Sequence, residues 1–371
     1  MDMSGESLRI GIVARDLEKT DGGTGVMLDQ LLRRLDTDAH GHRIYIIHRS
    51  PGLGKAFSHV HTTVLRHPKP VFDFVDVPIW THRNKLDVVV YPKNVIPWGV
   101  RGKRILIVLD LAYFWTVDQR HAYPLMDRLF MTRMMTLSSR RADSVAAISH
   151  NTRTDLHRQL GLDREKTTVL PLAAAECFTP VTSPSELDRV RSLYRLPERF
   201  ILFTGGLSPR KNIVRLIEAF QLIQGEYPGL HLILTGGRGW RNAKEAALIE
   251  ANPRIRRLGS VPGQDLPALY SLASLCAYPS LYEGFGIPVL EAQACGCPVL
   301  ASNVSSIPEV AGDGAHYADP YSAHGIAAGC RAILDDDAYR DALIQKGFHN
   351  KRRYSWDESA AILLKLCEAI N

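Results

Sequence analysis

The chain has 371 residues, which at roughly one domain per 150 residues predicts two domains. Hydrophobic residues make up 45% and charged residues 23%, a globular composition that excludes a disordered or fibrous protein. The net charge is +6, no apolar run approaches the roughly 18 residues that a membrane span needs, and the first residues lack the apolar core of a signal peptide. These features predict a cytoplasmic protein.

Five short apolar runs rich in Val and Ile follow one another in the first half of the chain. They are residues 8–14, 42–48, 86–91, 104–110 and 144–149. Helical stretches lie between several of them, for example residues 27–35, where Leu and Met recur at helical spacing. Nearly continuous apolar strands that alternate with helices are typical of a parallel sheet covered on both faces. We therefore expect a doubly wound α/β domain over residues 1–175.

A glycine-rich loop with Gly22, Gly23 and Gly25 follows the first of these runs and precedes a helix. Glycine there permits the backbone to approach a ligand closely. The spacing differs from the G-x-G-x-x-G fingerprint of dinucleotide-binding folds, which argues against an NAD-dependent enzyme.

The first half of the chain carries the whole excess of positive charge. Residues 1–175 contain 25 basic and 18 acidic side chains, a net charge of +7, against −1 for residues 176–371. Residues 125–141 mix large apolar side chains with four Arg residues. The stretch is either a helix packed on the sheet or a basic amphipathic helix in peripheral contact with an anionic membrane surface. No nucleic-acid-binding motif is present, so nucleic acid is not an expected partner.

The proline-containing stretch 172–185 predicts a hinge, after which the alternation of strands and helices starts again. The apolar runs of the second half are residues 200–206, 231–237, 255–260, 275–280 and 298–303. We therefore expect a second doubly wound domain over residues 176–353, facing the first across a cleft. An amphipathic helix over residues 356–370 ends the chain.

Two adjacent cations, Arg210 and Lys211, stand just before a helix of this second domain. Cations at a helix start oppose the helix dipole, so local stability does not select them there. A bound anion removes that conflict, and an Arg fork beside a Lys suits a diphosphate.

A second candidate anion site lies in residues 278–291, where a turn with Gly284 and Gly286 opens a helix at Pro288. Glu283 falls in the turn and Glu291 in the first helical turn, which predicts that the two carboxylates lie on two walls of one pocket. Ribose hydroxyls are suitable partners for a carboxylate beside a phosphate site. Alternatively, Glu291 only favours the helix dipole and Glu283 is a loop charge.

The second half resembles the retaining glycosyltransferases of the GT-B fold, in particular glycosyltransferase family 4. The resemblance rests on the E-x7-E spacing of Glu283 and Glu291, on GGLSPRKN at 205–212 and on LILTGGRGW at 232–240. The RKN sequence and Gly239-Trp240 are most similar to mannosyltransferases of that family. In this fold the final helix, within residues 354–371, crosses back to the first domain.

The resemblance implies roles for individual residues. Arg210 and Lys211 neutralise the donor's diphosphate, and Glu283 lies close to the transferred sugar, where it steadies positive charge as the glycosidic bond loosens. Glu291 holds the ribose hydroxyls. The positions implied to contact the donor are Gly23, Gly206, Gly286, Ile287, Pro288, Val289 and Glu291.

The sequence departs from the family pattern at two points. Many relatives have a His-Asp pair after the fifth strand, whereas this chain has Leu109-Asp110 and keeps only the acid as a catalytic candidate. Many relatives also have Arg where this chain has Gly206. The missing His supports an alternative, a catalytically idle sugar-nucleotide-binding protein that acts as a partner or regulator.

The sequence thus predicts a retaining hexosyltransferase that uses a nucleoside-diphosphate sugar, with mannose from GDP-mannose as the first expectation, and a glycan or lipid-linked acceptor. We expect no cofactor and no metal. Asp335-Asp336-Asp337 contains a literal D-x-D but reads as a helix cap, and Cys295 and Cys297 form a poor zinc site.

Overall fold

The computed structural model describes residues 7–15, 17, 23–49, 57–115, 123–237 and 243–371. Two of the sequence features named above, Gly22 and Gly239-Trp240, lie outside these residues. The chain forms two compact units. The first contains Met1–Phe114, Pro124–Leu172 and Trp356–Asn371, and the second contains Trp115–Tyr123 and Ala173–Ser355.

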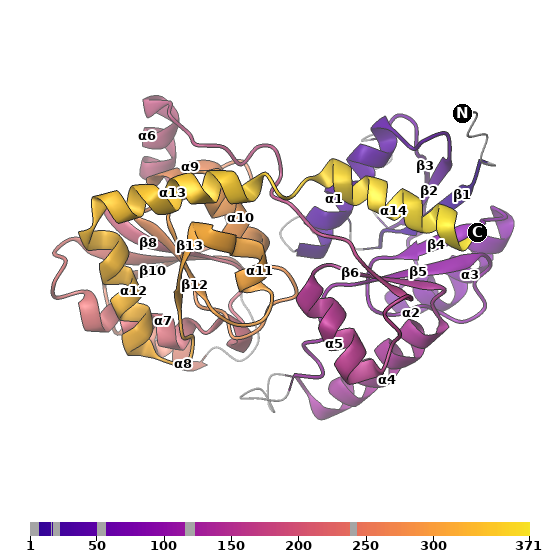
Figure 1. The fold of residues 1–371 in the computed structure, drawn as a ribbon, viewed down its shortest axis with the longest axis horizontal. Helices are drawn as coiled ribbons and strands as arrows, with labels where there is room; N and C mark the ends of the chain where they lie inside the picture. Colours follow the sequence, from indigo (N-terminus) through magenta and orange to yellow (C-terminus); the bar gives the residue numbers. More distant parts are fainter. Residues whose placement is uncertain (1–6, 16, 18–22, 50–56, 116–122, 238–242) are drawn as a thin grey trace. The chain divides into compact units, whose positions relative to one another are not determined.

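The first unit is built on a seven-stranded sheet with the order β3-β2-β1-β4-β5-β6-β7, in which all neighbouring strands are parallel (Figure 1). Its strands are β1 Arg9–Val13, β2 Arg43–His48, β3 His61–Val64, β4 Val88–Tyr91, β5 Lys103–Val108, β6 Ser144–Ala147 and β7 Thr167–Val169. Its helices are α1 Gly23–Thr37, α2 Lys69–Val71, η2 Phe72–Asp76, α3 Val77–Arg83, α4 Leu125–Arg141, α5 His150–Leu160 and α14 Trp356–Ile370.

The C-terminal helix α14 belongs to the first unit, which confirms that the chain crosses back (Figure 1). It lies beside α1, where the Arg34 guanidinium approaches the Asp357 carboxylate to 2.8 Å. The buried Ser359 hydroxyl donates to the Pro171 carbonyl at 2.6 Å, so the last helix is also tied to the end of the segment that leaves the unit.

The second unit has a six-stranded parallel sheet with the order β10-β9-β8-β11-β12-β13. Its strands are β8 Arg199–Thr204, β9 Leu230–Thr235, β10 Ile255–Gly259, β11 Leu275–Tyr278, β12 Val299–Ser302 and β13 Ala315–Ala318. Its helices are α6 Pro184–Leu193, η3 Pro209–Lys211, α7 Ile213–Ile223, α8 Ala243–Glu250, α9 Leu266–Leu272, α10 Ile287–Ala294, α11 Ile307–Ala311, η4 Gly312–Gly314, α12 Ala323–Asp335 and α13 Asp337–Lys351.

Both sheets confirm the predicted doubly wound α/β folds. In each, the strand order reverses at one point, between β1 and β4 in the first unit and between β8 and β11 in the second. Such a switch point is where open α/β sheets bind their ligands, because the loops that leave the two central strands diverge there. In the second unit, the loops that follow β8 and β11 are therefore the expected place for a ligand site.

Candidate active site

The two segments singled out from the sequence follow β8 and β11, which are neighbours at the switch point of the second sheet. The β8 loop continues into the short helix η3, which carries Arg210 and Lys211. The β11 loop carries Glu283 and leads into α10. The backbone joins the loops directly, because the Leu281 amide donates to the Arg210 carbonyl at 2.7 Å. The adjacency that the sequence pattern predicted for these cations and this acid is present.

The Glu283 carboxylate lies between the two cations. The Lys211 ammonium is 2.6 Å from Glu283 Oε1, and the Arg210 guanidinium donates to Glu283 Oε2. Lys211 and Glu283 are only 7% and 5% exposed, so this ion pair is shielded from water. Glu283 is thus a partner of both cations rather than a solvated loop charge. In the protein without a ligand, the positive charge expected to attract an anion is already balanced in part by this carboxylate.

Tyr278, the last residue of β11, completes the cluster. Its hydroxyl donates to Glu283 Oε1 at 3.1 Å and accepts from Lys211, whose ammonium lies 4.6 Å from the centre of the Tyr278 ring. Burial alone raises the pKa of the Glu283 carboxyl, but Arg210 and Lys211 outweigh burial and lower its pKa to about 2. Glu283 is therefore ionised at any physiological pH.

Two serines hold the backbone around Glu283. The Ser305 hydroxyl donates to the Glu283 carbonyl at 2.7 Å, and the Ser306 hydroxyl donates to the Phe285 carbonyl at 2.8 Å. These hydroxyls supply the hydrogen bonds that the loop carbonyls would otherwise receive from backbone amides in a helix or strand. Sequence reasoning missed both serines, since a Ser-Ser pair before a helix reads as an ordinary cap.

Glu291 lies in the second turn of α10, which corrects the expectation that it falls in the first turn, because the helix already begins at Ile287. It is 9% exposed, and the Tyr270 hydroxyl donates to Glu291 Oε2 at 3.0 Å. The Tyr270 and Thr204 hydroxyls lie 2.6 Å apart, so a short polar chain connects β8 with α10. Burial raises the pKa of the Glu291 carboxyl to about 7, although the Tyr270 bond lowers it. Unlike Glu283, this acid has no cation as a hydrogen-bond partner among the described residues.

The raised pKa of Glu291 predicts a pH dependence of stability. The unfolded chain loses this proton near pH 4.5, whereas the folded protein keeps it until about pH 7. Stability from this group is therefore fully present below pH 4.5 and falls by up to about 3 kcal/mol as pH rises to 7. We expect Glu291→Gln to remove this slope. Urea unfolding of both proteins between pH 4.5 and 7.5 measures it, and parallel pH profiles would contradict the assignment.

The start of α10 offers fewer backbone amides to an anion than the sequence predicted. Gly286 caps the helix at φ 113°, and a Cβ there would lie 2.7 Å from Ile307 Cδ1, so the position requires glycine. Pro288 has no amide hydrogen, and the Val289 amide donates to the Gly286 carbonyl at 3.0 Å. The predicted amide donors thus reduce to those of Gly286 and Ile287.

The remaining predicted positions lie in looser surroundings. A Cβ built on Gly206 would meet no atom within 4 Å, which leaves space beside the β8 loop. Gly23 begins α1 in the first unit and is equally open. Asp110 follows β5 of the first unit, where its carboxylate accepts from the Ala112 amide at 3.0 Å. The roles of these residues stay predictions.

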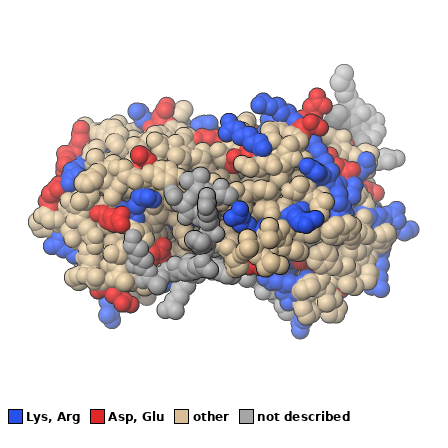
Figure 2. All heavy atoms as spheres, turned by 90° about the horizontal axis from the view of Figure 1, so that it is seen from below, with Lys and Arg blue, Asp and Glu red and all other residues tan. Residues whose placement is uncertain are grey.

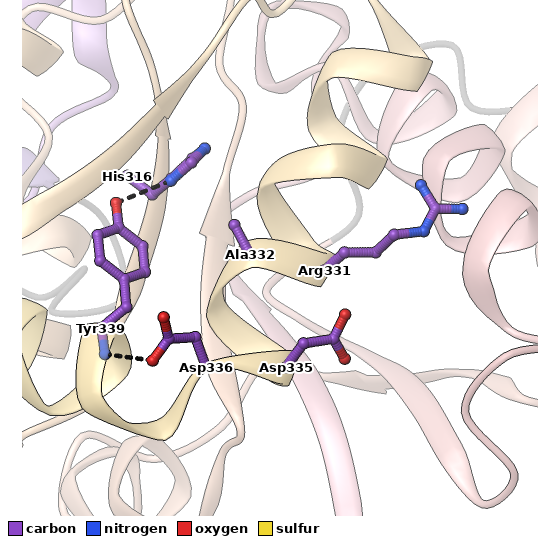
Figure 3. Close-up of a pocket in the computed structure, with 6 residues that line it drawn as sticks. All are labelled: His316, Arg331, Ala332, Asp335, Asp336 and Tyr339. Carbon is purple, nitrogen blue, oxygen red and sulfur yellow. Dashed lines mark hydrogen bonds between the residues drawn. The ribbon is translucent and has the colours of Figure 1, made fainter.

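A surface pocket of about 500 Å³ lies elsewhere in the second unit, at the corner between α12 and α13 (Figure 3). Its lining residues are His316, Arg331, Ala332, Asp335, Asp336 and Tyr339. Asp336 caps α13 by accepting from the Tyr339 amide at 2.8 Å, which confirms that the acidic run is a helix cap. The Tyr339 hydroxyl and His316 Nδ1 are 2.9 Å apart, while Arg331 pairs with Glu226 outside the pocket lining.

The described residues contain no cluster of three or more His, Cys, Asp or Glu side chains that could hold a metal ion. No helix among them is both long and apolar enough to cross a membrane.

Comparisons with known proteins agree with these observations. The model described as Glycosyltransferase Family 4 matches residues 21–173, and the model described as Glycosyl transferases group 1 matches residues 185–350. O-antigen chain mannosyltransferase B of Escherichia coli is 32% identical over 93% of this chain and 89% of its own length. Sucrose-phosphate synthase from Thermosynechococcus elongatus is similar in structure, with a TM-score of 0.77, 21% identity and coverage of 97% and 98% of the two chains. Anabaena Alr3699/HepE in complex with UDP-glucose gives a TM-score of 0.76 at 19% identity, covering 96% and 99%.

Proposed function

Since the chain belongs to glycosyltransferase family 4, we propose that it is a retaining mannosyltransferase, which transfers mannose from GDP-mannose to a hydroxyl of a glycan or lipid-linked acceptor. The observation that carries the proposal is the cluster of half-buried Arg210 with buried Lys211 and Glu283 at the switch point of the second sheet. Mannose is favoured because a relative of almost equal length is a mannosyltransferase. That relative acts on an O-antigen chain, which supports a place in polysaccharide synthesis.

The donor diphosphate is the group that this cluster suits. Arg210 supplies a planar fork and Lys211 a compact charge, and both stand at the carboxyl end of the sheet. The amides of Gly286 and Ile287 lie at the start of α10, after the neighbouring strand of that sheet. Glu291, one turn further along α10, would accept hydroxyl donors of the nucleoside ribose. Its pKa near 7 means that binding such donors also favours its ionised form.

Catalysis on this proposal is mainly electrostatic. As the glycosidic bond loosens, negative charge grows on the leaving diphosphate, and Arg210 and Lys211 stabilise it without a metal ion. Glu283, ionised at neutral pH, stabilises positive charge on the sugar. With the leaving group held in this way, the acceptor hydroxyl would attack from the same face and pass its proton to the departing phosphate oxygen, which retains the anomeric configuration. Asp110 is a candidate contact of the sugar or the acceptor.

The proposal places the enzyme in the cytoplasm, in contact with the inner face of the membrane where a lipid-linked acceptor would be found. The net charge of +7 in residues 1–175 supports attraction to an anionic surface.

A panel of GDP-mannose, UDP-glucose and ADP-glucose tests the donor. We expect GDP-mannose to raise the melting temperature most, because a ligand that binds only the folded protein stabilises it by mass action. Turnover should release GDP in the presence of EDTA, and NMR of the product should show the α configuration of the donor retained. Stabilisation by GDP-mannose without GDP release with any acceptor would favour the idle binding protein, for which Leu109 in place of His is the supporting feature.

A further inference from the structure

We propose that one face of the first unit, made by the helical segment Lys69–Arg83 and by α4, is a docking surface for an anionic lipid bilayer. The proposal deepens the membrane contact named in the proposed function and rests on it. Of the thirteen large apolar side chains that are exposed among the described residues, ten lie on these helices or on the loop at Trp98. They are Val71, Phe74, Val75, Ile79, Trp98, Leu125, Met126, Leu129, Phe130 and Leu137.

The apolar side chains of α4 form a stripe that faces solvent. Leu125, Met126, Leu129 and Phe130 recur at the spacing of one helical face and are 51–74% exposed. The helix instead buries Met134, Met135, Ser138 and Ser139 in its second half. The large apolar residues in the first half of α4 are therefore not buried in the core, contrary to the expectation for an ordinary helix that covers a sheet.

The second helical segment, α2–η2–α3, covers the same side of the same sheet. Its buried Phe72 and Trp80 share one core cluster with Met135 of α4 and with strand residues of β1, β4 and β5. On its outer side Phe74, Val75 and Ile79 are 44–47% exposed. Both segments follow the carboxyl end of a strand, β3 and β5 respectively, so their first turns begin at the same edge of the sheet.

The charges on this face suit an anionic partner. Residues 69–83 and 125–141 contain six Lys and Arg and three Asp. One of the acids, Asp73, is neutralised by Arg15, and the Asp76 carboxylate lies 2.8 Å from His67 Nδ1. Figure 2 views the molecule from the side on which α4 lies in Figure 1, and Lys and Arg gather over the first unit there.

Exposed apolar side chains with Lys and Arg on the same helices suit the interface of an anionic membrane. The apolar groups enter the boundary between headgroups and acyl chains, while the cations stay with anionic headgroups. Trp98, 52% exposed with the Arg141 guanidinium 4.7 Å from its ring, adds the amphipathic aromatic that is enriched at that depth. The exposed apolar groups alone would also suit a protein partner. The cations beside them favour an anionic membrane over a protein.

Co-sedimentation of the full chain with vesicles tests the surface. We expect binding to vesicles of phosphatidylglycerol and phosphatidylcholine, and at least tenfold weaker binding to phosphatidylcholine alone. The double variant Leu129→Ser/Phe130→Ser should lose binding at least tenfold, and Arg133→Gln about fivefold. Leu193→Ser is the matched control, because Leu193 is 58% exposed but lies on α6 of the second unit. It should bind as the wild type does.

Equal binding by the double variant and the wild type, or equal binding to both vesicle types, would overturn the proposal. So would a stable dimer in sedimentation velocity that the double variant dissociates, because the face would then bind a second copy of the chain. Melting with and without GDP-mannose separates this result from the proposed function. Every variant should keep the donor-induced shift of the wild type, whereas a shift absent from all of them, wild type included, would count against the donor and not against the surface.

Discussion

Replacement of Lys211 by Ala is expected to lower the rate of glycosyl transfer by about three orders of magnitude. Lys211 supplies a buried ammonium at the switch point of the second sheet, 2.6 Å from Glu283. A fixed donor aimed at charge that develops in the transition state contributes about 10²–10³ in rate, and a full charge shielded from water contributes at the upper end of that range. Because the charge on the diphosphate grows as the bond breaks, kcat should fall more than the KM for the donor rises.

The measurement needs a check on folding, since Ala leaves Glu283 with Arg210 as its remaining cation. Breaking a buried pair costs about 3–5 kcal/mol, so Lys211→Met, which keeps the apolar stem, is the companion variant. Arg199→Ala serves as the control, because Arg199 is an exposed cation at the opposite end of β8. Either Lys211 variant, once shown by its melting curve to be folded, should be nearly inactive. Turnover within threefold of wild type would refute the role given to Lys211.

The interior of each sheet could be predicted from sequence, whereas some of its edges could not. All ten apolar runs form strands. Nine of them are central strands, which in a parallel sheet are buried on both faces and continuously apolar in sequence, and the tenth, β10, is an edge strand. The strands that were missed, β3, β7 and β13, are all edge strands. β3 reads His-Thr-Thr-Val and is exposed or half-buried throughout, so its sequence carries no apolar signal.

The candidate site was predicted through its charged residues but not through the residues that support them. Arg210 and Lys211 stand out because cations at a helix start oppose the helix dipole, and Glu283 stands out through its E-x7-E spacing to Glu291. Tyr278 and Tyr270 were missed, since a Tyr that ends a strand or lies in a helix looks like core, and both are fully buried. The Tyr270 hydroxyl acquires its partners only when β8, α9 and α10 come together. The Tyr278 hydroxyl meets Lys211 only when η3 lies against the β11 loop. That juxtaposition is a property of the tertiary fold and leaves no mark on local sequence.

Replacement of Glu283 by Gln is expected to act in opposite directions on binding and on transfer. In the protein without a ligand, Glu283 neutralises part of the charge of Arg210 and Lys211. Gln has nearly the same shape without the charge, so the net charge of the three side chains rises from +1 to +2. A nucleoside diphosphate should then bind at least tenfold more tightly, because a unit charge about 4 Å away contributes several kcal/mol near a protein surface before screening. Transfer should fall by about 10²–10³, since the sugar loses its stabilising carboxylate.

The stability difference between wild type and Glu283→Gln should depend on pH in the opposite direction to that between wild type and Glu291→Gln. The pKa of Glu283 is lowered from 4.5 to about 2, so its contribution to stability is fully present above pH 4.5 and is lost as pH falls toward 2. Glu283→Gln should therefore be about 3 kcal/mol less stable than wild type at pH 7, and that gap should narrow below pH 4.5. Glu226→Gln breaks an exposed pair with Arg331 and should change stability by less than about 1 kcal/mol and leave nucleotide binding unaltered. Calorimetric titration with GDP measures the change in nucleotide binding, and urea unfolding across pH measures the change in stability. Weaker GDP binding in Glu283→Gln would mean that the carboxylate organises the two cations for the diphosphate, and not that it competes with the diphosphate for them.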